Sequence, residues 1–377
     1  MIYDYLIIGA GISGAAAACE LRDHGTIALI EAESSPGYHS TGRSAALYTR
    51  NFGGEIVRLI NRASHGFFQN PPAGFCNTPL LSPRGLITVA VPGDEGTLAP
   101  IVNQSTPDTA IDMLTAAQAC DMAPLLRPEF VGAATFEAGV ADIEVATLHQ
   151  AYLRSVKKSG GHLVCSMRID GISRKGGAWH ISACGGTIIG KILVNAAGAW
   201  ADQVAVMSDA APVGLVAKRR TAIIVDPPER IDLTHLPAME FADANSYIKP
   251  EAGKLMASPG DETPVEPQDV QPEDWDIAVL ADWLQRRTFI EVRRIEHSWA
   301  GLRTFAADDA PVVGFDPGVE GLFWLAGQGG YGIMMAPALG RTAASLILQG
   351  GLPDDLVSLG VIEDDLSPGR FTATRSA

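Results

Sequence analysis

The sequence has little cysteine, fewer basic than acidic residues, and no long hydrophobic run. Its five cysteines are odd in number and far apart, and no C-x-x-C motif or Cys/His cluster occurs, which argues against a metal site and favours a reducing compartment. No run of about 18 apolar residues is present, so we expect no membrane span. The net charge is −15, with 28 Lys and Arg against 43 Asp and Glu. A nucleic-acid groove or an anionic membrane is therefore not expected as a partner.

The composition is otherwise that of an ordinary soluble protein. Hydrophobic residues make up 47% of the 377 residues and charged residues 19%, and a chain of this length can bury the cores of two domains. An apolar run begins at Leu6, so we expect no signal or transit peptide. These features predict a cytoplasmic enzyme, which we expect to be a monomer.

Residues 3–31 contain the clearest motif of the chain. A strand-like apolar run is followed by Gly9, Gly11 and Gly14 at G-x-G-x-x-G spacing, then by a helix of small residues, a second apolar run and Glu31. Gly9 permits a tight turn, Gly11 lets a diphosphate approach the backbone, and Gly14 lets the helix pack closely on the strand. The helix N-terminus would face the diphosphate, and Glu31 would accept hydrogen bonds from a ribose 2′-hydroxyl. The order of these parts predicts a dinucleotide site for FAD or NAD rather than NADP.

Three further stretches indicate the same site. Residues 34–54 form a loop rich in Ser, Thr and Gly, and residues 191–200 (KILVNAAGAW) repeat the pattern of buried strand, small residues and glycine. Residues 321–348 contain a strand, the turn QGGYG and a long helix. That helix N-terminus would stabilise the negative charge of reduced flavin, although a plain strand-to-helix turn is the alternative. Because β-rich sequence interrupts these elements twice, we expect FAD, with a second domain that closes over its reactive ring.

The expected fold is therefore α/β, with a Rossmann-type FAD-binding domain interleaved with a β-rich substrate-binding domain. We assign residues 1–55, 143–212 and 297–377 to the FAD-binding domain, and residues 56–142 and 213–296 to the substrate-binding domain. Roughly the last 20 residues are expected to form a poorly ordered tail. The expected cofactor-binding residues are Gly9, Gly11, Ile12, Ser13, Gly14, Glu31, Ala32, Ser40, Thr41, Gly42, Arg43, Ser44, Ala45, Ala46, Ala196, Ala197, Gly198, Trp200, Gly327, Gly329, Gly330, Tyr331, Gly332 and Ile333.

The chain resembles the D-amino-acid-oxidase-type flavoproteins in four segments, GAGISG, YHSTGRSAA, VNAAGAW and GQGGYGI. Within that family it is most similar to bacterial FAD-dependent D-arginine dehydrogenases, in the segments NPPAGFC, PLLSPR, KRR and WAGLR. The resemblance covers nearly the whole length. It implies non-covalently bound FAD, a two-domain fold, and oxidation of a small-molecule D-amino acid to the imino acid, with a quinone, a dye or oxygen as electron acceptor.

The resemblance also implies which residues hold the substrate. Arg220 and Arg303 match two arginines that clamp the substrate carboxylate, a task suited to the planar guanidinium fork. Tyr247 matches a tyrosine hydroxyl at the same carboxylate. Gly330 matches a backbone carbonyl that would hold the substrate amine.

The side-chain pocket departs from the arginine-specific pattern. Leu47, Phe52, Leu86 and Met334 stand where that branch has a histidine, a tyrosine, a glutamate and a glutamine. A guanidinium buried without a partner is costly, so we expect D-leucine, D-methionine or D-phenylalanine to be preferred to D-arginine. Glu240 leaves two alternatives open, because it could bind a basic substrate from another direction or be an exposed strand residue.

Other functions also fit the sequence. An oxidase, or a dehydrogenase of N-substituted amino acids or 2-hydroxy acids, could use the same carboxylate clamp. A flavin-binding subunit without activity is a different class, and the paired arginines together with Tyr247 argue against it.

Overall fold

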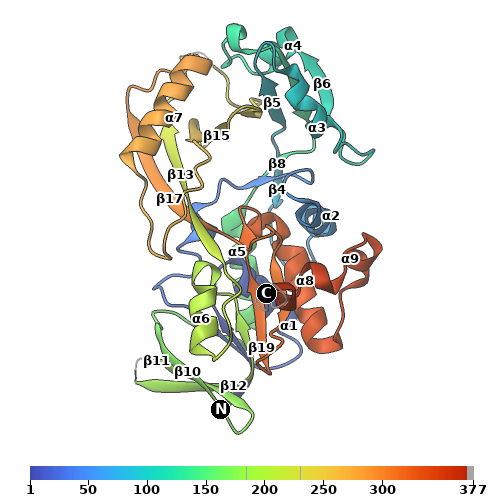
Figure 1. The fold of residues 1–377 in the computed structure, drawn as a ribbon, viewed down its shortest axis with the longest axis vertical. Coiled ribbons are helices and arrows are strands. Elements are labelled where there is room, and N and C mark those ends of the chain that lie inside the picture. Colours follow the sequence, from blue (N-terminus) through green and yellow to red (C-terminus); the bar gives the residue numbers. More distant parts are fainter. Residues whose placement is uncertain (184, 230, 372–377) are drawn as a thin grey trace.

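Five parallel strands form the centre of an eight-stranded sheet in the lower half of Figure 1. The computed structural model describes residues 1–183, 185–229 and 231–371. The parallel order is β9-β2-β1-β12-β19, with β18 antiparallel to β19 and the β10–β11 hairpin extending from the first half of β12. These strands are β1 (Ile2–Ile8), β2 (Ile27–Ile30), β9 (His162–Val164), β10 (Ile169–Lys175), β11 (Ala178–Ala183), β12 (Gly186–Asn195), β18 (Val312–Phe315) and β19 (Leu322–Ala326).

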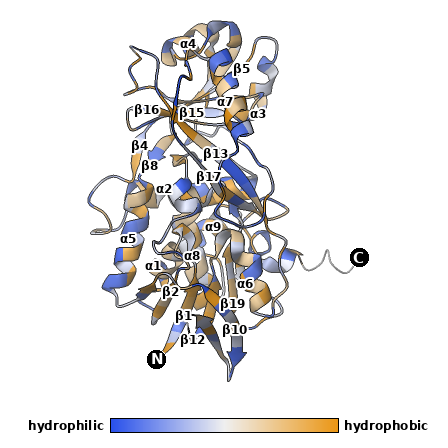
Figure 2. Ribbon diagram, turned by 90° about the vertical axis from the view of Figure 1, so that its left-hand side faces the viewer, coloured by the Kyte–Doolittle hydropathy of each residue, from blue (hydrophilic) through white to orange (hydrophobic). Residues whose placement is uncertain are grey.

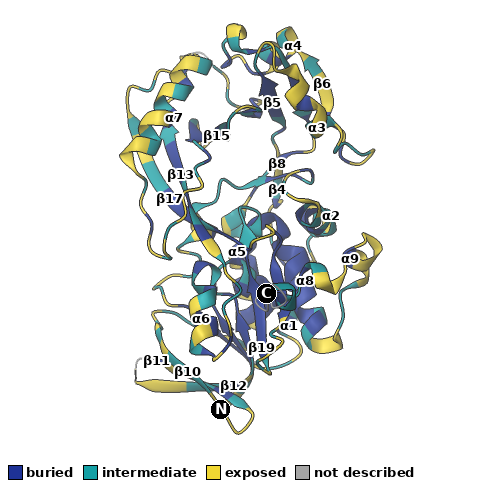
Figure 3. Ribbon diagram, in the orientation of Figure 1, coloured by how far each residue is buried: buried dark blue, intermediate teal, exposed yellow. Residues whose placement is uncertain are grey.

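Both faces of this sheet are covered, which explains its continuous apolar runs. Successive side chains point to opposite faces, so Ile7 and Leu29 pack against helices α1, α5 and α8, whereas Leu6 and Ala28 pack against α6. Figures 2 and 3 show the hydrophobic, buried residues gathered in this sheet and in the helix faces turned toward it. The helices are α1 (Ile12–Leu21), α5 (Val145–Lys158), α6 (Ala201–Met207) and α8 (Gly332–Gln349).

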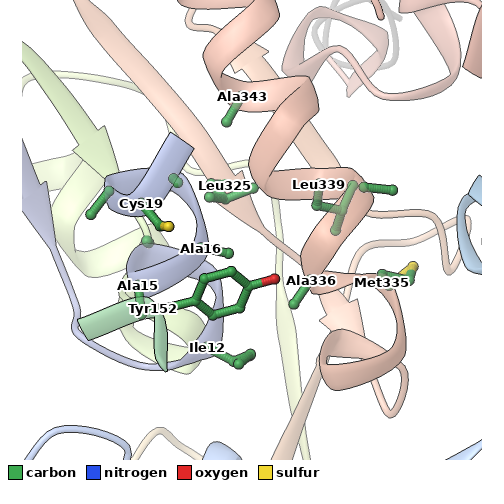
Figure 4. Packing of buried hydrophobic residues seen from close by; sticks show 14 of the residues in the cluster. Ile12, Ala15, Ala16, Cys19, Tyr152, Leu325, Met335, Ala336, Leu339 and Ala343 are labelled. Atoms are coloured by element: carbon green, nitrogen blue, oxygen red, sulfur yellow. The ribbon is translucent and has the colours of Figure 1, made fainter. Parts of the chain in front are cut away.

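Small residues bring α1 and α8 close together. Figure 4 shows Ala15 and Ala16 of α1 opposite Ala336 and Leu339 of α8. A Cβ added to Gly340 of α8 would lie 3.0 Å from the Cβ of Ala16, a tight contact. This packing holds the N-terminus of α8 beside that of α1, and both become part of the site described below.

The upper half of Figure 1 is a nine-stranded sheet in the order β20-β17-β13-β16-β15-β14-β5-β7-β6. One face carries an apolar core that includes Ile87, Met239 and Ile248 and packs on α4 and α7. The bounds are β5 (Leu86–Ala90), β6 (Asp112–Thr115), β7 (Ala133–Glu137), β13 (Val216–Val225), β14 (Ala238–Phe241), β15 (Tyr247–Glu251), β16 (Lys254–Ser258), β17 (Ile295–Phe305), β20 (Gln328–Gly329), α4 (Ala116–Met122) and α7 (Asp274–Arg287). The opposite face is more polar, and it carries the substrate-site residues discussed below.

A three-stranded sheet, β3-β8-β4, connects the two halves. Asp142 of β8 accepts hydrogen bonds from Arg84 at 2.7 Å and from Lys249 at 2.8 Å. Lys249 belongs to the nine-stranded sheet and is only 2% exposed, so this ion pair fixes one sheet on the other. The remaining elements are β3 (Leu47–Tyr48), β4 (Leu81–Pro83), β8 (Ala141–Ile143), α2 (Glu55–Gln69), α3 (Ala99–Val102), α9 (Asp354–Ser358) and the 3₁₀ turns η1 (Ser40–Arg43), η2 (Glu95–Leu98), η3 (Pro128–Phe130), η4 (Gly198–Trp200), η5 (Glu363–Asp365) and η6 (Pro368–Phe371).

The structure corrects the expectation of a poorly ordered C-terminal tail. Residues 354–371 form α9, η5 and η6, and Leu356 and Leu366 are fully buried. Arg370 donates a 2.7 Å hydrogen bond to Asp308, which ties the segment to the parallel sheet beside β18. Isolated apolar residues among acidic ones gave no periodicity, so packing alone decides this segment. Residues 372–377 of the tail lie outside the described residues.

The assigned domain segments remain a prediction. The parallel sheet is built from residues inside the segments proposed for the FAD-binding domain, whereas most of the nine-stranded sheet comes from the other two segments. Residues 295–305 and 328–329 pair with the nine-stranded sheet, although most of them fall in the segment 297–377. In the described part of the chain, no helix is both long enough and apolar enough to cross a membrane.

Candidate active site

The glycine turn after β1 is held by close backbone contacts. Gly9 has φ of +99°, and a Cβ there would overlap the carbonyl oxygen of Ala196, the residue after β12. A Cβ on Gly14 would overlap the carbonyl oxygen of Gly9. At Gly11 the nearest atom to an added Cβ is the Thr41 hydroxyl, at 3.2 Å. Gly9 and Gly14 are therefore required by the protein's own packing, whereas Gly11 leaves room for a ligand to approach the backbone.

Glu31 lies at the end of β2 and faces the same turn. Its carboxylate accepts hydrogen bonds from the backbone N–H groups of Ala10 at 2.9 Å and Glu33 at 3.0 Å, and the residue is 9% exposed. These two bonds fix the orientation of the carboxylate. Each oxygen keeps further acceptor capacity for a ribose hydroxyl.

The loop after β2 is fastened to both halves of the molecule. The Thr41 hydroxyl accepts a hydrogen bond from Ile12 N at 3.0 Å, and Ser40 donates to the Leu302 carbonyl at 2.6 Å. Arg43 donates to the Ala300 carbonyl at 2.9 Å and pairs with Asp269. The guanidinium of Arg43 therefore attaches the loop to β17, a role that motif reading alone did not suggest.

These elements enclose one elongated cavity between the parallel sheet and β17. The expected cofactor residues that line it are Gly9, Gly11, Ile12, Ser13, Glu31, Ala32, Ser40, Thr41, Arg43, Ser44, Ala196, Ala197, Gly198, Trp200, Gly327, Gly329, Gly330, Gly332 and Ile333. Gly14, Gly42, Ala45, Ala46 and Tyr331 do not line this cavity. Several residues that sequence reasoning missed also line it, among them the polar residues Arg168, Gln203 and Gln328.

The cavity fits a dinucleotide with a flavin. The N-termini of α1 and α8 both open into it, and neither N-cap residue, Gly11 or Tyr331, caps its helix with a side chain; the Thr41 hydroxyl accepts from Ile12 N at the start of α1. The positive ends of the two helices suit the diphosphate and a negatively charged ring. Gln328 Oε1 accepts a hydrogen bond from Ser13 at 2.9 Å, while Gln328 Nε2 is buried without a partner. A flavin or phosphate acceptor would satisfy that orphaned donor. Gln328 lies within the GQGGYGI segment, so the motif itself could have identified it.

Two arginines stand side by side at the wall formed by β13 and β17. Arg220 pairs with Gly301 and Arg303 pairs with Lys218 across these antiparallel strands. Because alternate residues share a face, both guanidinium groups lie on the same, more polar face of the nine-stranded sheet. Both also line the cofactor cavity. The structure therefore brings together the two arginines expected to clamp a carboxylate.

Arg303 is enclosed by the turn before α8. Its Nη1 donates a 3.0 Å hydrogen bond to the Gly330 carbonyl, and a Cβ on Gly330 would overlap the guanidinium. Burial lowers the pKa of Arg303, and the like charge of Arg220 adds to this, whereas Tyr247 raises it. An anionic ligand would favour the charged form of this half-buried guanidinium and so offset the lowered pKa.

Arg220 already has an internal partner. Its Nε donates to the Asp261 carbonyl at 2.8 Å and its Nη2 to Glu262 at 2.9 Å. The other oxygen of Glu262 accepts from Lys218 at 2.9 Å. A substrate carboxylate would therefore compete with Glu262 for Arg220.

The expected pocket residues lie beyond the cofactor cavity. Glu240 pairs across the sheet with Tyr247 and with Thr88. Leu86, two residues before Thr88 in β5, is on the same face of the sheet. Met334 of α8 contacts the loop after β3, where the Thr49 N–H donates to its sulfur at 3.4 Å. Leu47 pairs with Asp142 in the small sheet, and Phe52 is 51% exposed with its ring 5.6 Å from that of Tyr331. Leu47, Phe52, Leu86, Glu240, Met334 and Tyr247 do not line the cofactor cavity.

Glu240 is not the exposed strand residue that one sequence alternative described. Its Oε1 accepts a 2.9 Å hydrogen bond from the Thr88 hydroxyl, and burial raises the pKa of its carboxyl. The charge of Glu137, an acid that sequence reasoning missed, raises it further. Glu137 is at the end of β7 and had no local sequence signal. Among the described residues, no cluster of His, Cys, Asp and Glu could hold a metal ion.

Comparison with known proteins identifies the class that this fold and cavity define. Residues 4–346 match the model of the family of FAD dependent oxidoreductases, and the chain belongs to that family. Its cofactor is therefore FAD.

Three curated relatives are similar over parts of their length. FAD-dependent oxidoreductase domain-containing protein 1 of Bos taurus is 28% identical over 42% of this chain and 36% of that protein. Glycine oxidase of Geobacillus kaustophilus is 25% identical over 63% of this chain and 62% of that protein. The mitochondrial dimethylglycine dehydrogenase of Homo sapiens is 25% identical over 68% of this chain and 31% of that protein. The chain thus spans less than two thirds of the length of these relatives.

Among solved structures, L-proline dehydrogenase from P. horikoshii superposes with a TM-score of 0.86 at 21% identity, over 99% of this chain and 98% of that chain. At this identity the likeness concerns the fold. Because it covers 99% of this chain, it includes both sheets.

Proposed function

We propose that this protein is a dehydrogenase that oxidises a D-amino acid to the imino acid, which water then converts to the 2-oxo acid and ammonia. The observation that carries the proposal is the pair Arg220 and Arg303 on one sheet face at the end of the FAD cavity. A pair of guanidinium groups is suited to an α-carboxylate. The family relationship to glycine oxidase supports an amino acid as the substrate class.

In this proposal FAD supplies the hydride acceptor, and the chain supplies position and charge. Arg303, which is half-buried at the cavity wall, anchors the carboxylate, and Arg220 becomes its second arm once Glu262 is displaced. Tyr247 donates its hydroxyl to the same carboxylate. The Gly330 carbonyl, which accepts one bond from Arg303, has a second lone pair for the substrate amine. Fixing carboxylate and amine together orients the α-hydrogen toward the ring.

A second candidate has a specific observation in its favour. Dimethylglycine dehydrogenase, by its name, acts on an N-substituted amino acid, and it is similar to this chain over 68% of the chain. The same carboxylate clamp would serve such a substrate, because the substituent is on nitrogen and the carboxylate is unchanged.

The test is anaerobic bleaching of the bound flavin by a panel of D- and L-amino acids, N-methyl amino acids and 2-hydroxy acids. We expect bleaching by D-amino acids and not by their L-enantiomers. Faster bleaching by N-methyl amino acids would favour the second candidate. Flavin that stays oxidised with every compound would refute both, and would indicate a non-catalytic flavin subunit. Admission of air afterwards distinguishes an oxidase from a dehydrogenase that needs a quinone or dye.

A further inference from the structure

Two carboxylates converge on the polar face of the nine-stranded sheet, next to the substrate clamp. Glu240 of β14 lies directly opposite Tyr247 of β15. The Tyr247 side chain is in turn close enough to Arg303 to raise the pKa of that arginine. Glu137 of β7 lies directly opposite Leu86 of β5. Since β5 runs between β14 and β7, the two acids flank one strand on the same face.

Hydroxyl groups bind both acids, and no ion pair among the described residues includes either. Thr88 donates to Glu240 at 2.9 Å, and Thr49 donates to Glu137 at 2.8 Å. Lys249, a buried cation on the same face, pairs instead with Asp142 and Glu251. Arg50 acts on Glu137 only through space, while its own Nη2 donates to the Asp108 carbonyl.

An independent observation indicates a missing donor at the same place. Asn51 is 5% exposed, and its Nδ2 donates to the Thr109 carbonyl at 3.2 Å. Its side chain also interacts with the Glu137 carboxylate. The remaining acceptor, Asn51 Oδ1, is buried without any partner. Two acids that have hydroxyl donors but no cation, and an amide oxygen that has no donor, thus lie close together. Removing such groups from water is unfavourable unless a ligand supplies the positive charge and the missing donor.

The cluster of Glu137, Glu240 and Asn51 is also connected to the cofactor side. Thr49, which donates to Glu137, uses its backbone N–H to contact the sulfur of Met334 on α8. The N-terminus of that helix opens into the FAD cavity. The cluster therefore lies between the sheet face and α8, with arginines at one end of this face and acids at the other.

We propose that Glu240 and Glu137, with Asn51 Oδ1, bind a terminal ammonium group on the side chain of the amino-acid substrate. This assignment rests on the proposed function, in which Arg220 and Arg303 hold the α-carboxylate. An ammonium group has three donors and no acceptor, which matches a cluster made of acceptors. Leu86 and Met334 provide apolar walls for the methylene stem of such a side chain. The substrate class becomes that of diamino acids of lysine or ornithine length, in place of the apolar class expected from Leu47, Phe52, Leu86 and Met334.

The experiment compares D-lysine with D-norleucine, which has the same four-carbon stem without the ammonium group. The kcat/KM for reduction of a dye is measured for the flavin-loaded protein and for the E240Q, E137Q and E251Q variants. Glu251 is an acid on the same sheet face that pairs with Lys249, so E251Q is the matched control. Flavin absorbance of each variant reports whether it is folded and loaded, and if E137Q loses flavin, E240Q alone carries the test.

We expect the unaltered protein to prefer D-lysine by more than tenfold. E240Q and E137Q should each lower kcat/KM for D-lysine by about ten- to hundredfold, because each loses a charge-assisted hydrogen bond, and should leave D-norleucine nearly unchanged. E251Q should change neither. A preference of the unaltered protein for D-norleucine, or an equal loss for both substrates in E240Q, would overturn the assignment while leaving the proposed function intact. Failure of every amino acid to reduce the flavin would overturn the proposed function and this assignment with it.

Discussion

The cofactor half and the substrate half of the site are built from different materials. The cofactor half uses backbone groups and small residues from short segments that follow strands of the parallel sheet, such as Gly11 after β1 and Gly198 after β12. The proposed substrate half uses charged side chains from four strands of the other sheet, including Arg303 of β17 and Glu137 of β7. The first half should therefore be sensitive to added bulk, and the second to lost charge.

The largest effect is expected when a bulky side chain is added to the backbone of the cofactor half. Gly11→Leu should yield a folded protein with no bound FAD, because only the Thr41 hydroxyl at 3.2 Å limits a Cβ in the protein itself, whereas a side chain there would fill the space of the diphosphate. Flavin absorbance and thermal unfolding of the purified variant measure loading and folding separately. A Gly11→Leu protein that carries its full complement of FAD would show that the diphosphate lies elsewhere.

The next effect tests the charged half. Arg303→Ala should lower turnover by about ten- to hundredfold, since a charge-assisted hydrogen bond contributes about 1.5–3 kcal/mol, with little loss of flavin. Arg220→Ala should act in the same direction but less strongly, because Asp261 and Glu262 already engage that side chain. Arg174→Ala, which removes an exposed arginine paired with Glu320, is the control. Normal turnover together with weak flavin binding in Arg303→Ala would assign this arginine to the cofactor.

A smaller effect concerns the competition for Arg220. Glu262→Gln should lower KM for the amino-acid substrate by roughly two- to fivefold with kcat unchanged, because a partly exposed ion pair contributes about 0.2–1 kcal/mol. The Glu262 side chain is 42% exposed, so its pair with Arg220 is of this weaker kind. Steady-state kinetics of the variant measure the effect. A higher KM would mean that Glu262 positions Arg220 rather than competing for it.

The smallest effect concerns how thermal stability depends on pH, through a histidine bound to the glycine turn after β1. His149 Nε2 donates to the Ala10 carbonyl at 2.8 Å, and burial lowers the pKa of His149. His149 therefore binds a proton near pH 6.5 in the unfolded chain, but only at a lower pH in the folded protein. The contribution of neutral His149 to the free energy of unfolding is complete above pH 6.5 and is lost as the pH falls through the lower pKa of the folded protein. His149→Gln should remove this contribution, so the drop in Tm between pH 8 and pH 5 should be smaller in the variant by a few degrees or less. An equal drop in both proteins would assign the acid sensitivity to other groups.

The sequence by itself determined the cofactor half, because the signals there are local. Gly9, Gly11, Gly14 and Glu31 are separated by a single strand, turn and helix, and backbone geometry alone relates their positions to a diphosphate and a ribose. Arg220 and Arg303 were identified through the family resemblance, and the register of β13 and β17 confirms that they share one face.

Only the tertiary structure decided the acid end of the substrate half. Glu137, Glu240 and Asn51 come from three distant segments, and their meeting depends on the parallel pairing of β14 with β5 and on the loop after β3. No periodicity encodes such a pairing, since strands joined through long connections carry no local mark of their partners. Tertiary structure also decided the packing of residues 354–371 and the attachment of Arg43 to β17. Each depends on contacts between residues far apart in the sequence.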